Sequence, residues 1–182
     1  MSSKAQRWRV PLGFAAAAAL ILWSRPRPLS LAIGLPLAAL GLVVRAYAAG
    51  HIRKNDALAT TGPYRFTRNP LYLGSALLGA GFVVAADYWL LAVVAVVLLV
   101  AVYLPVIRAE EEYLADRFGA AFAAYTRQVP RLWPRLRPAP AAGTGGFSLR
   151  LYRRHREYQA ALGFLALALV LVLKWMYFGA PA

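Results

Sequence analysis

The sequence predicts an all-α integral membrane protein that crosses the bilayer about five times. Hydrophobic residues make up 60% of its 182 residues, which is too large a share for a soluble domain with one core and a solvated surface. Apolar runs that approach the ~20 residues needed to span a bilayer recur along the chain. We place these runs at roughly 8–24, 29–49, 70–86, 88–107 and 158–178.

The first apolar run is shorter than the others but rich in Ala and Leu. Lys4, Arg7 and Arg9 precede it, and it ends near Arg25 without the small-residue pattern of a signal-peptide cleavage site. We therefore expect this run to stay in the mature chain as the first helix. The second run follows after a short link.

The third run has a clear helix start. Asn69 is a favoured N-cap residue and Pro70 a favoured first helical residue. We expect the free backbone N–H groups there, with the positive end of the helix dipole, to suit a carboxylate or phosphate near Arg65 and Arg68. The plainer alternative is that Asn-Pro only starts a helix and the two arginines only bind lipid headgroups.

Two segments of different composition follow the fourth run. Apolar residues at three- and four-residue spacings over 110–125 predict an amphipathic helix, which either lies along the membrane surface or continues the fourth helix and bends away. Pro, Arg and Gly then dominate 129–146, which predicts a linker or a loose flap. The last helix is entered through the basic cluster at 150–156.

The positive charge is distributed in a way that predicts topology. The formal net charge is +14, and Lys and Arg concentrate in the N-terminus, in the 50–69 loop, which includes Lys54, and at 108–157. By the positive-inside tendency these regions face the cytoplasm, while the turn at Asp87 lies outside with Arg25 and Arg27 as exceptions. Charge that follows the edges of apolar helices favours anionic lipid headgroups over nucleic acid as the partner.

Several kinds of site are excluded or disfavoured. The chain has no cysteine, which excludes disulfides, thiolate metal sites and cysteine nucleophiles. His51 and His155 lack metal-ligand spacing to a third donor, so no metal site is expected. We interpret Arg45, inside the second apolar run, as a residue that snorkels to the interface.

The adjacent carboxylates at Glu110, Glu111 and Glu112 are the strongest candidates for chemistry, because the chain has only 7 acidic residues. A carboxylate at a partly dehydrated membrane edge is costly unless a cation offsets it. Pairing of Arg108 with Glu112 one helical turn later would explain one of the three. The short turn after the third helix makes a helix hairpin, so we expect one or two of the three to meet Arg68 or a cationic ligand across it.

These motifs resemble a known membrane enzyme group. Gly62-Pro63-Tyr64, then Arg68-Asn69-Pro70-Leu71-Tyr72-Leu73-Gly74, a helix hairpin, and Glu110-Glu111 with Val129-Pro130 further on are similar to the isoprenylcysteine carboxyl methyltransferase and phospholipid methyltransferase superfamily. The resemblance covers roughly residues 50 to 134. Asn69 stands where the family commonly has His, so a role that needs a titrating imidazole is in doubt, and Phe122 stands where Tyr is usual.

The resemblance implies an enzyme that uses S-adenosyl-L-methionine and methylates a lipid or lipidated acceptor, with its site facing the cytoplasm of the bacterial inner membrane. It assigns catalytic roles to Arg68, Glu110 and Glu111. The cofactor-binding residues it implies are Tyr64, Asn69, Pro70, Tyr72, Gly74, Tyr125 and Arg127. Together with the apolar runs and the Pro- and Gly-rich segment, it divides the chain into two N-terminal spanning helices (1–50), a methyltransferase core (51–137), a linker (138–149) and a last spanning helix (150–182).

The acceptor and two rival functions stay open at this point. An isoprenylcysteine-like carboxylate is the first expectation, with an ethanolamine headgroup or a small thiol as alternatives. A membrane reductase that uses NADPH on a sterol or fatty-chain double bond would have a similar helical arrangement. A basic lipid-binding scaffold without activity is the third class.

Overall fold

The computed structural model describes residues 4–53, 57–140, 143 and 145–178, so the expectation for Lys54 lies outside the described residues. The described chain is helical and contains no strand, which confirms the all-α prediction. Its elements are α1 (Lys4–Trp23), α2 (Pro28–Ala49), the 3₁₀ turn η1 (Gly62–Arg65), α3 (Pro70–Ala86), α4 (Trp89–Leu98), the π-helical segment η2 (Leu99–Tyr103), α5 (Leu104–Gln128), α6 (Leu149–Arg154) and α7 (Tyr158–Phe178).

The five predicted spans all lie on helices. Three helical stretches are long and apolar enough to cross a membrane by length and composition: α2, the continuous run from α4 through α5, and α7. Two shorter apolar helices accompany them, the Gly13–Trp23 part of α1 and α3. The chain is therefore a polytopic membrane protein.

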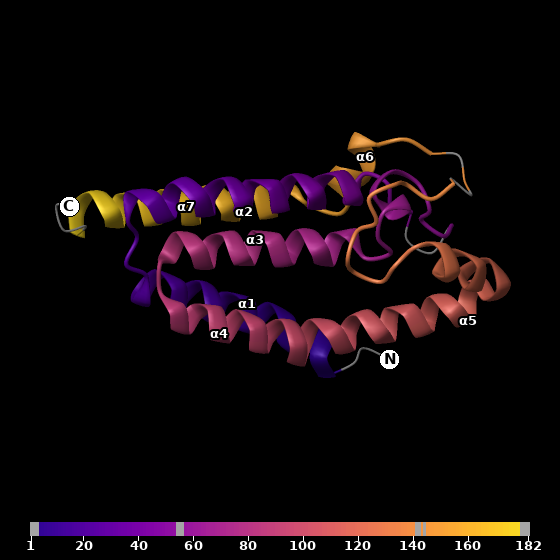
Figure 1. The fold of residues 1–182 in the computed structure, drawn as a ribbon, viewed down its shortest axis with the longest axis horizontal. Helices are drawn as coiled ribbons and strands as arrows, with labels where there is room; N and C mark the ends of the chain where they lie inside the picture. The colour runs from indigo at the N-terminus through magenta and orange to yellow at the C-terminus, as the bar shows by residue number, and fades with distance from the viewer. Residues whose placement is uncertain (1–3, 54–56, 141–142, 144, 179–182) are drawn as a thin grey trace.

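The helices run along one long axis, and the loops gather at its two ends (Figure 1). One end carries the α3–α4 turn, the α1–α2 link and the C-terminal end of α7 (Figure 1). There Arg27 forms an ion pair with Asp87, and the backbone N–H of Arg25 donates to the carbonyl of Ala86 over 2.7 Å. The two arginines that are exceptions to the charge pattern are thus tied to the turn. The η1 loop, α5 and α6 occupy the opposite end.

Glycines allow α2 and α3 to pack with their backbones in contact. A Cβ atom built on Gly81 would lie 2.3 Å from the backbone nitrogen of Ala38, and one on Gly41 would lie 2.3 Å from that of Leu78. Gly34 approaches Ala85 equally closely. Small residues at helix interfaces let backbones approach in this way where lipid removes the hydrophobic drive between helices. The α2–α3 pair therefore forms the centre of the bundle, and the other helices pack around it.

The fourth span continues into α5 through the π-helical segment, so the second of the two predicted alternatives for 110–125 is correct. Gly119 interrupts α5 with φ 46° and ψ −119°, a backbone conformation that is available essentially only to glycine. The helix changes direction there, and Phe122 beyond the break is buried. The continuation therefore bends back over the end of the bundle.

The predicted loose flap is wrong for residues 130–139. The backbone N–H of Arg68 donates to the carbonyl of Pro130 over 2.9 Å, and the N–H groups of Arg135 and Ala139 donate to the carbonyls of Phe66 and Arg65. The prolines of this segment prevent regular structure, as expected, but these hydrogen bonds hold it against residues 65–68. Hydrogen bonds between residues so far apart in the sequence leave no local pattern from which they could be predicted.

Candidate functional site

A buried carboxylate stands where three segments of the chain meet. Glu111 of α5 is 8% exposed. Its Oε1 atom lies 3.3 Å from Nη2 of Arg68 and accepts a 3.2 Å hydrogen bond from Nδ2 of Asn69. Its Oε2 atom lies 2.7 Å from Nη2 of Arg131 and accepts from that residue's Nε over 2.8 Å. Two guanidinium groups and an amide thus offset the cost of burying one carboxylate.

The start of α3 supplies part of this cluster, although not by the expected cap. Pro70 is the first helical residue, but the side chain of Asn69 makes no capping hydrogen bond. Its amide instead donates to Glu111 and, over 2.9 Å, to the carbonyl of Arg131. A hydrogen bond to an ionised carboxylate is stronger than one between neutral groups, so the amide is oriented by Glu111 rather than by the first turn of the helix. The prediction of a side-chain N-cap was wrong.

The cluster borders a polar cavity of about 710 Å³ between the ends of α2, α3 and α5 and the turn that precedes α7. Eight of the ten residues that the resemblance singled out line it. They are Tyr64, Arg68, Asn69, Pro70, Tyr72, Glu110, Glu111 and Tyr125. The structure therefore brings the two separated motifs to one space at one end of the bundle.

Two predicted residues lie elsewhere. Gly74 packs against α2, where a Cβ atom on it would lie 2.7 Å from Cγ of Arg45 and 2.8 Å from the carbonyl oxygen of Gly41. Arg127 is exposed in the last turn of α5. It follows Tyr125 by two positions, which places the two side chains on different faces of a helix. Neither residue lines the cavity, so the structure does not support their expected contact with a cofactor.

Two buried polar atoms beside the cavity have no hydrogen-bond partner in the described part of the chain: the hydroxyl of Tyr64 and Nε of Arg68. Burial raises the pKa of Tyr64, so its phenol stays neutral at physiological pH. Tyr125 fastens this turn to α5, because its hydroxyl donates to the backbone carbonyl of Tyr64 over 2.6 Å. Unsatisfied buried polar groups are costly, and a polar ligand in the cavity would relieve that cost.

Sequence reasoning missed a second buried ion pair. The guanidinium of Arg45 binds Glu157 through Nη2 at 2.8 Å and Nε at 3.1 Å and also contacts the hydroxyl of Ser75. The expectation that Arg45 snorkels was therefore wrong. A signal was present in the sequence, since Glu157 is a rare acid directly before an apolar helix. Arg131 was missed because it lies in a segment that seemed unstructured.

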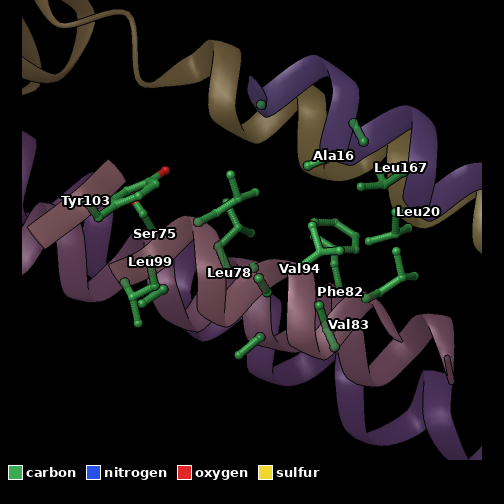
Figure 2. A pocket seen from close by; sticks show the side chains of 18 of the residues that line it. Ala16, Leu20, Ser75, Leu78, Phe82, Val83, Val94, Leu99, Tyr103 and Leu167 are labelled. Atoms are coloured by element: carbon green, nitrogen blue, oxygen red, sulfur yellow. The ribbon is translucent and has the colours of Figure 1, made fainter. Parts of the chain in front are cut away.

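An apolar cavity of about 560 Å³ adjoins the polar one. Side chains of α1, α3, α4 and α7 line it, among them Leu20, Phe82, Val94 and Leu167 (Figure 2). Arg45, Ser75 and Tyr103 line both cavities, and Figure 2 places Ser75 and Tyr103 together at one end of the apolar one. A charged chamber and a hydrocarbon-lined chamber therefore share a boundary.

Similarity to known proteins agrees with this arrangement. Residues 29–121 match the model of a family described as phospholipid methyltransferase. The cobalt-zinc-cadmium resistance protein CzcN of Cupriavidus metallidurans is 35% identical over 174 residues, which cover 90% of this chain and 77% of that protein. The nickel-cobalt-cadmium resistance protein NccN of Alcaligenes xylosoxydans is 33% identical over 105 residues, 57% of this chain and 48% of that protein. No solved structure matches the chain significantly.

Proposed function

Because the chain belongs to the phospholipid methyltransferase family, we propose that it transfers a methyl group from S-adenosylmethionine to an amphiphilic acceptor in the membrane. The observation that carries the proposal is the boundary shared by the two cavities. A polar, mixed-charge chamber suits a cosubstrate that carries both anionic and cationic groups, and the apolar chamber suits an acyl or prenyl chain. We propose that the polar chamber faces the cytoplasm of the bacterial inner membrane.

The residues around the polar cavity fit S-adenosylmethionine, which carries a carboxylate, an ammonium and a sulfonium. Arg68 has an unpaired Nε and is the partner we propose for the carboxylate. Glu110 lines the cavity and takes part in none of the ion pairs within the described ranges, which leaves it to bind the ammonium. The faces of Tyr72 and Tyr103 can attract a sulfonium. A volume of about 710 Å³ also lies in the usual range for small-molecule sites.

The chain contributes alignment and exclusion of water. When bound, S-adenosylmethionine would supply an electrophilic methyl carbon: the acceptor's lone pair would bond to this carbon while the carbon–sulfur bond breaks and its electron pair stays on sulfur, which leaves as the neutral thioether. An amine or thiol acceptor would also release one proton to solvent, whereas a carboxylate would not. The ion-paired Glu111 holds Arg68 in place, and backbone hydrogen bonds between residues 130–139 and residues 65–68 fix the loop that carries it. Rigid alignment in a dehydrated site is what such a displacement mainly requires.

The acceptor on this proposal has an apolar tail. An isoprenylcysteine-like carboxylate, an ethanolamine headgroup and a long-chain thiol all meet that condition.

The two relatives are named for resistance to metal ions, and we propose that this chain contributes to such resistance by modifying a membrane component. An NADPH-dependent reductase and a lipid-binding scaffold are the rivals that the first experiment must separate.

Replacing Arg68 by Ala is expected to weaken S-adenosylmethionine binding about 10- to 100-fold, since a charged hydrogen bond of ~1.5–3 kcal/mol is lost. The measurement is the rise in thermal midpoint of the purified protein as S-adenosylmethionine is added, because only a ligand of the folded state stabilises it. Arg68→Lys, which keeps the charge beside Glu111 but loses the fork geometry, reports on binding if Arg68→Ala does not fold.

Arg108→Ala is the matched control, since Arg108 is exposed on α5 and outside the cavity lining. It should bind S-adenosylmethionine like the wild type. Stabilisation of the wild type by NADPH and not by S-adenosylmethionine would favour the reductase. Stabilisation by neither would favour the scaffold.

A further inference from the structure

We propose that α6 binds the phosphate groups of anionic phospholipids through three arginines on one of its faces. Arg150, Arg153 and Arg154 are exposed, and together they are called the arginine face below. They line neither cavity, so this surface is separate from the proposed site of methyl transfer and its role does not depend on that reaction.

Contacts with α2 hold α6 in place directly before the last spanning helix. The backbone N–H of Ser148 donates to the carbonyl of Gly50 over 2.9 Å, and Nδ1 of His155 lies 3.2 Å from the carbonyl oxygen of Ala49. Both ends of α6 are thus fixed to the end of α2. Because α2 and α7 are long and apolar enough to cross a membrane, a helix between the end of one and the start of the other lies at the bilayer surface. Figure 1 shows α6 at this end of the bundle.

Aromatic side chains around α6 indicate the same depth. Tyr47, Phe147 and Tyr158 are each 43–48% exposed. The rings of Tyr47 and Phe147 stack, with centroids 6.2 Å apart and an interplanar angle of 14°, and Tyr158 is the first residue of α7. Exposed aromatic rings at the ends of spanning helices are typical of the headgroup region of a bilayer. The arginine face therefore lies within reach of lipid phosphates.

The three arginines project from one side of α6. At 3.6 residues per turn, positions 150, 153 and 154 fall within about 100° of one another around the helix axis. Leu151 and Tyr152, between them in the sequence, are half-buried. The helix thus packs through other side chains and presents its arginines outward.

The charge of the arginine face is not neutralised within the described ranges of the chain. The ion pairs found there involve other residues, and Glu157, the acidic residue nearest to α6 in the sequence, is bound to Arg45. Guanidinium groups match the geometry of phosphate oxygens with pairs of hydrogen bonds. Clustered basic residues beside a spanning helix also attract anionic lipids electrostatically. An anionic phospholipid supplies the missing negative charge at the right depth.

The test adds two lipids with the same acyl chains, phosphatidylglycerol and phosphatidylcholine, to the full-length protein in micelles of an uncharged detergent. Binding is measured from the thermal midpoint at each lipid concentration, since a ligand of the folded state raises it. We expect phosphatidylglycerol, which carries a net negative charge, to act at a lower concentration than zwitterionic phosphatidylcholine. Arg150→Gln/Arg154→Gln should raise the concentration of phosphatidylglycerol that is needed by about 10-fold, because two attractive charges are lost.

Two further measurements separate charge from structure. Arg150→Lys/Arg154→Lys keeps both charges and should keep most of the response to phosphatidylglycerol, although it loses the fork geometry. Raising the salt concentration should weaken the wild-type response, which tests the role of charge without any substitution.

Arg108→Gln/Arg137→Gln is the matched control, since it removes the same charge from two exposed residues outside α6 and should respond like the wild type. Equal wild-type responses to the two lipids, or an equal loss in both Gln double variants, would overturn the proposal, because the arginine face would then recognise no lipid. A response to free glycerol phosphate at the concentration at which phosphatidylglycerol acts would also overturn it, because the ligand would then be a soluble phosphate.

Discussion

Replacing Glu111 by Gln is expected to reduce methyl transfer by about 100-fold or more. The substitution keeps the shape of the side chain but removes the charge that holds Arg68 and Arg131, which contact the two carboxylate oxygens at 3.3 and 2.7 Å. Displacement of a catalytic group by about 1 Å can cost ~100-fold in rate. Breaking a buried ion pair from one side also destabilises a fold by about 3–5 kcal/mol. The rate of label transfer from methyl-labelled S-adenosylmethionine to membrane lipids measures the first effect.

The neighbouring residue provides the control. Glu112 is exposed and forms no ion pair in the part of the chain that the structure describes, so Glu112→Gln should keep both rate and thermal midpoint. Glu111→Asp keeps the charge and serves if the Gln variant does not fold. On the proposed role in metal resistance, Glu111→Gln should also remove the metal tolerance that the wild-type chain confers on cells. A folded Glu111→Gln protein with the wild-type transfer rate would refute a role for the cluster.

Replacing Gly81 by Ala is expected to lower the free energy of unfolding strongly, although the substitution adds only one methyl group. The new Cβ atom would lie 2.3 Å from the backbone nitrogen of Ala38 and 2.6 Å from the carbonyl oxygen of Gly34. Backbone atoms cannot rotate away as side chains do, so α2 and α3 must separate. Overpacking of this kind typically lowers the free energy of unfolding by about 1–3 kcal/mol and occasionally by more. We expect a loss at or above that range because α2 and α3 form the centre of the bundle.

Gly79→Ala, on the same helix, is the matched control for stability. A Cβ atom there would meet nothing within 4 Å, and Ala is favoured over Gly in a helix by about 1 kcal/mol. Thermal unfolding in detergent should therefore give an unchanged or slightly higher midpoint for Gly79→Ala and a clearly lower one for Gly81→Ala. Equal midpoints would mean that the close approach of α2 and α3 does not stabilise the protein.

Local signals in the sequence predicted the helices and the part of the site in which Arg68 meets Glu111. Apolar length marked the spans, and Asn69-Pro70 placed the start of α3 because proline tolerates only the first turn of a helix. The short turn at Asp87 implied the hairpin, and the hairpin implied that Arg68 and Glu111 would meet. These inferences depend on chain connectivity and residue type, which a sequence displays directly.

The remaining contacts of the site, those made by Arg131 and Glu157, join segments that share no local sequence pattern. Arg131 reaches Glu111 from a proline-rich stretch, and Glu157 reaches Arg45 across 112 positions. The role of Gly74 depends on packing in the same way: a glycine in a motif can serve a ligand or a neighbouring helix, and in the structure Gly74 packs against α2. Side-chain partners, unlike helix positions, are determined by tertiary packing.

The central claim is that the polar cavity binds the methyl donor, and an experimental structure with S-adenosylhomocysteine, the demethylated product, tests it most directly. We expect density for the nucleoside between α3 and α5, with the amino-acid carboxylate at Arg68 and the ammonium at Glu110. Density at another place on the protein, or an empty polar cavity at saturating ligand, would contradict it.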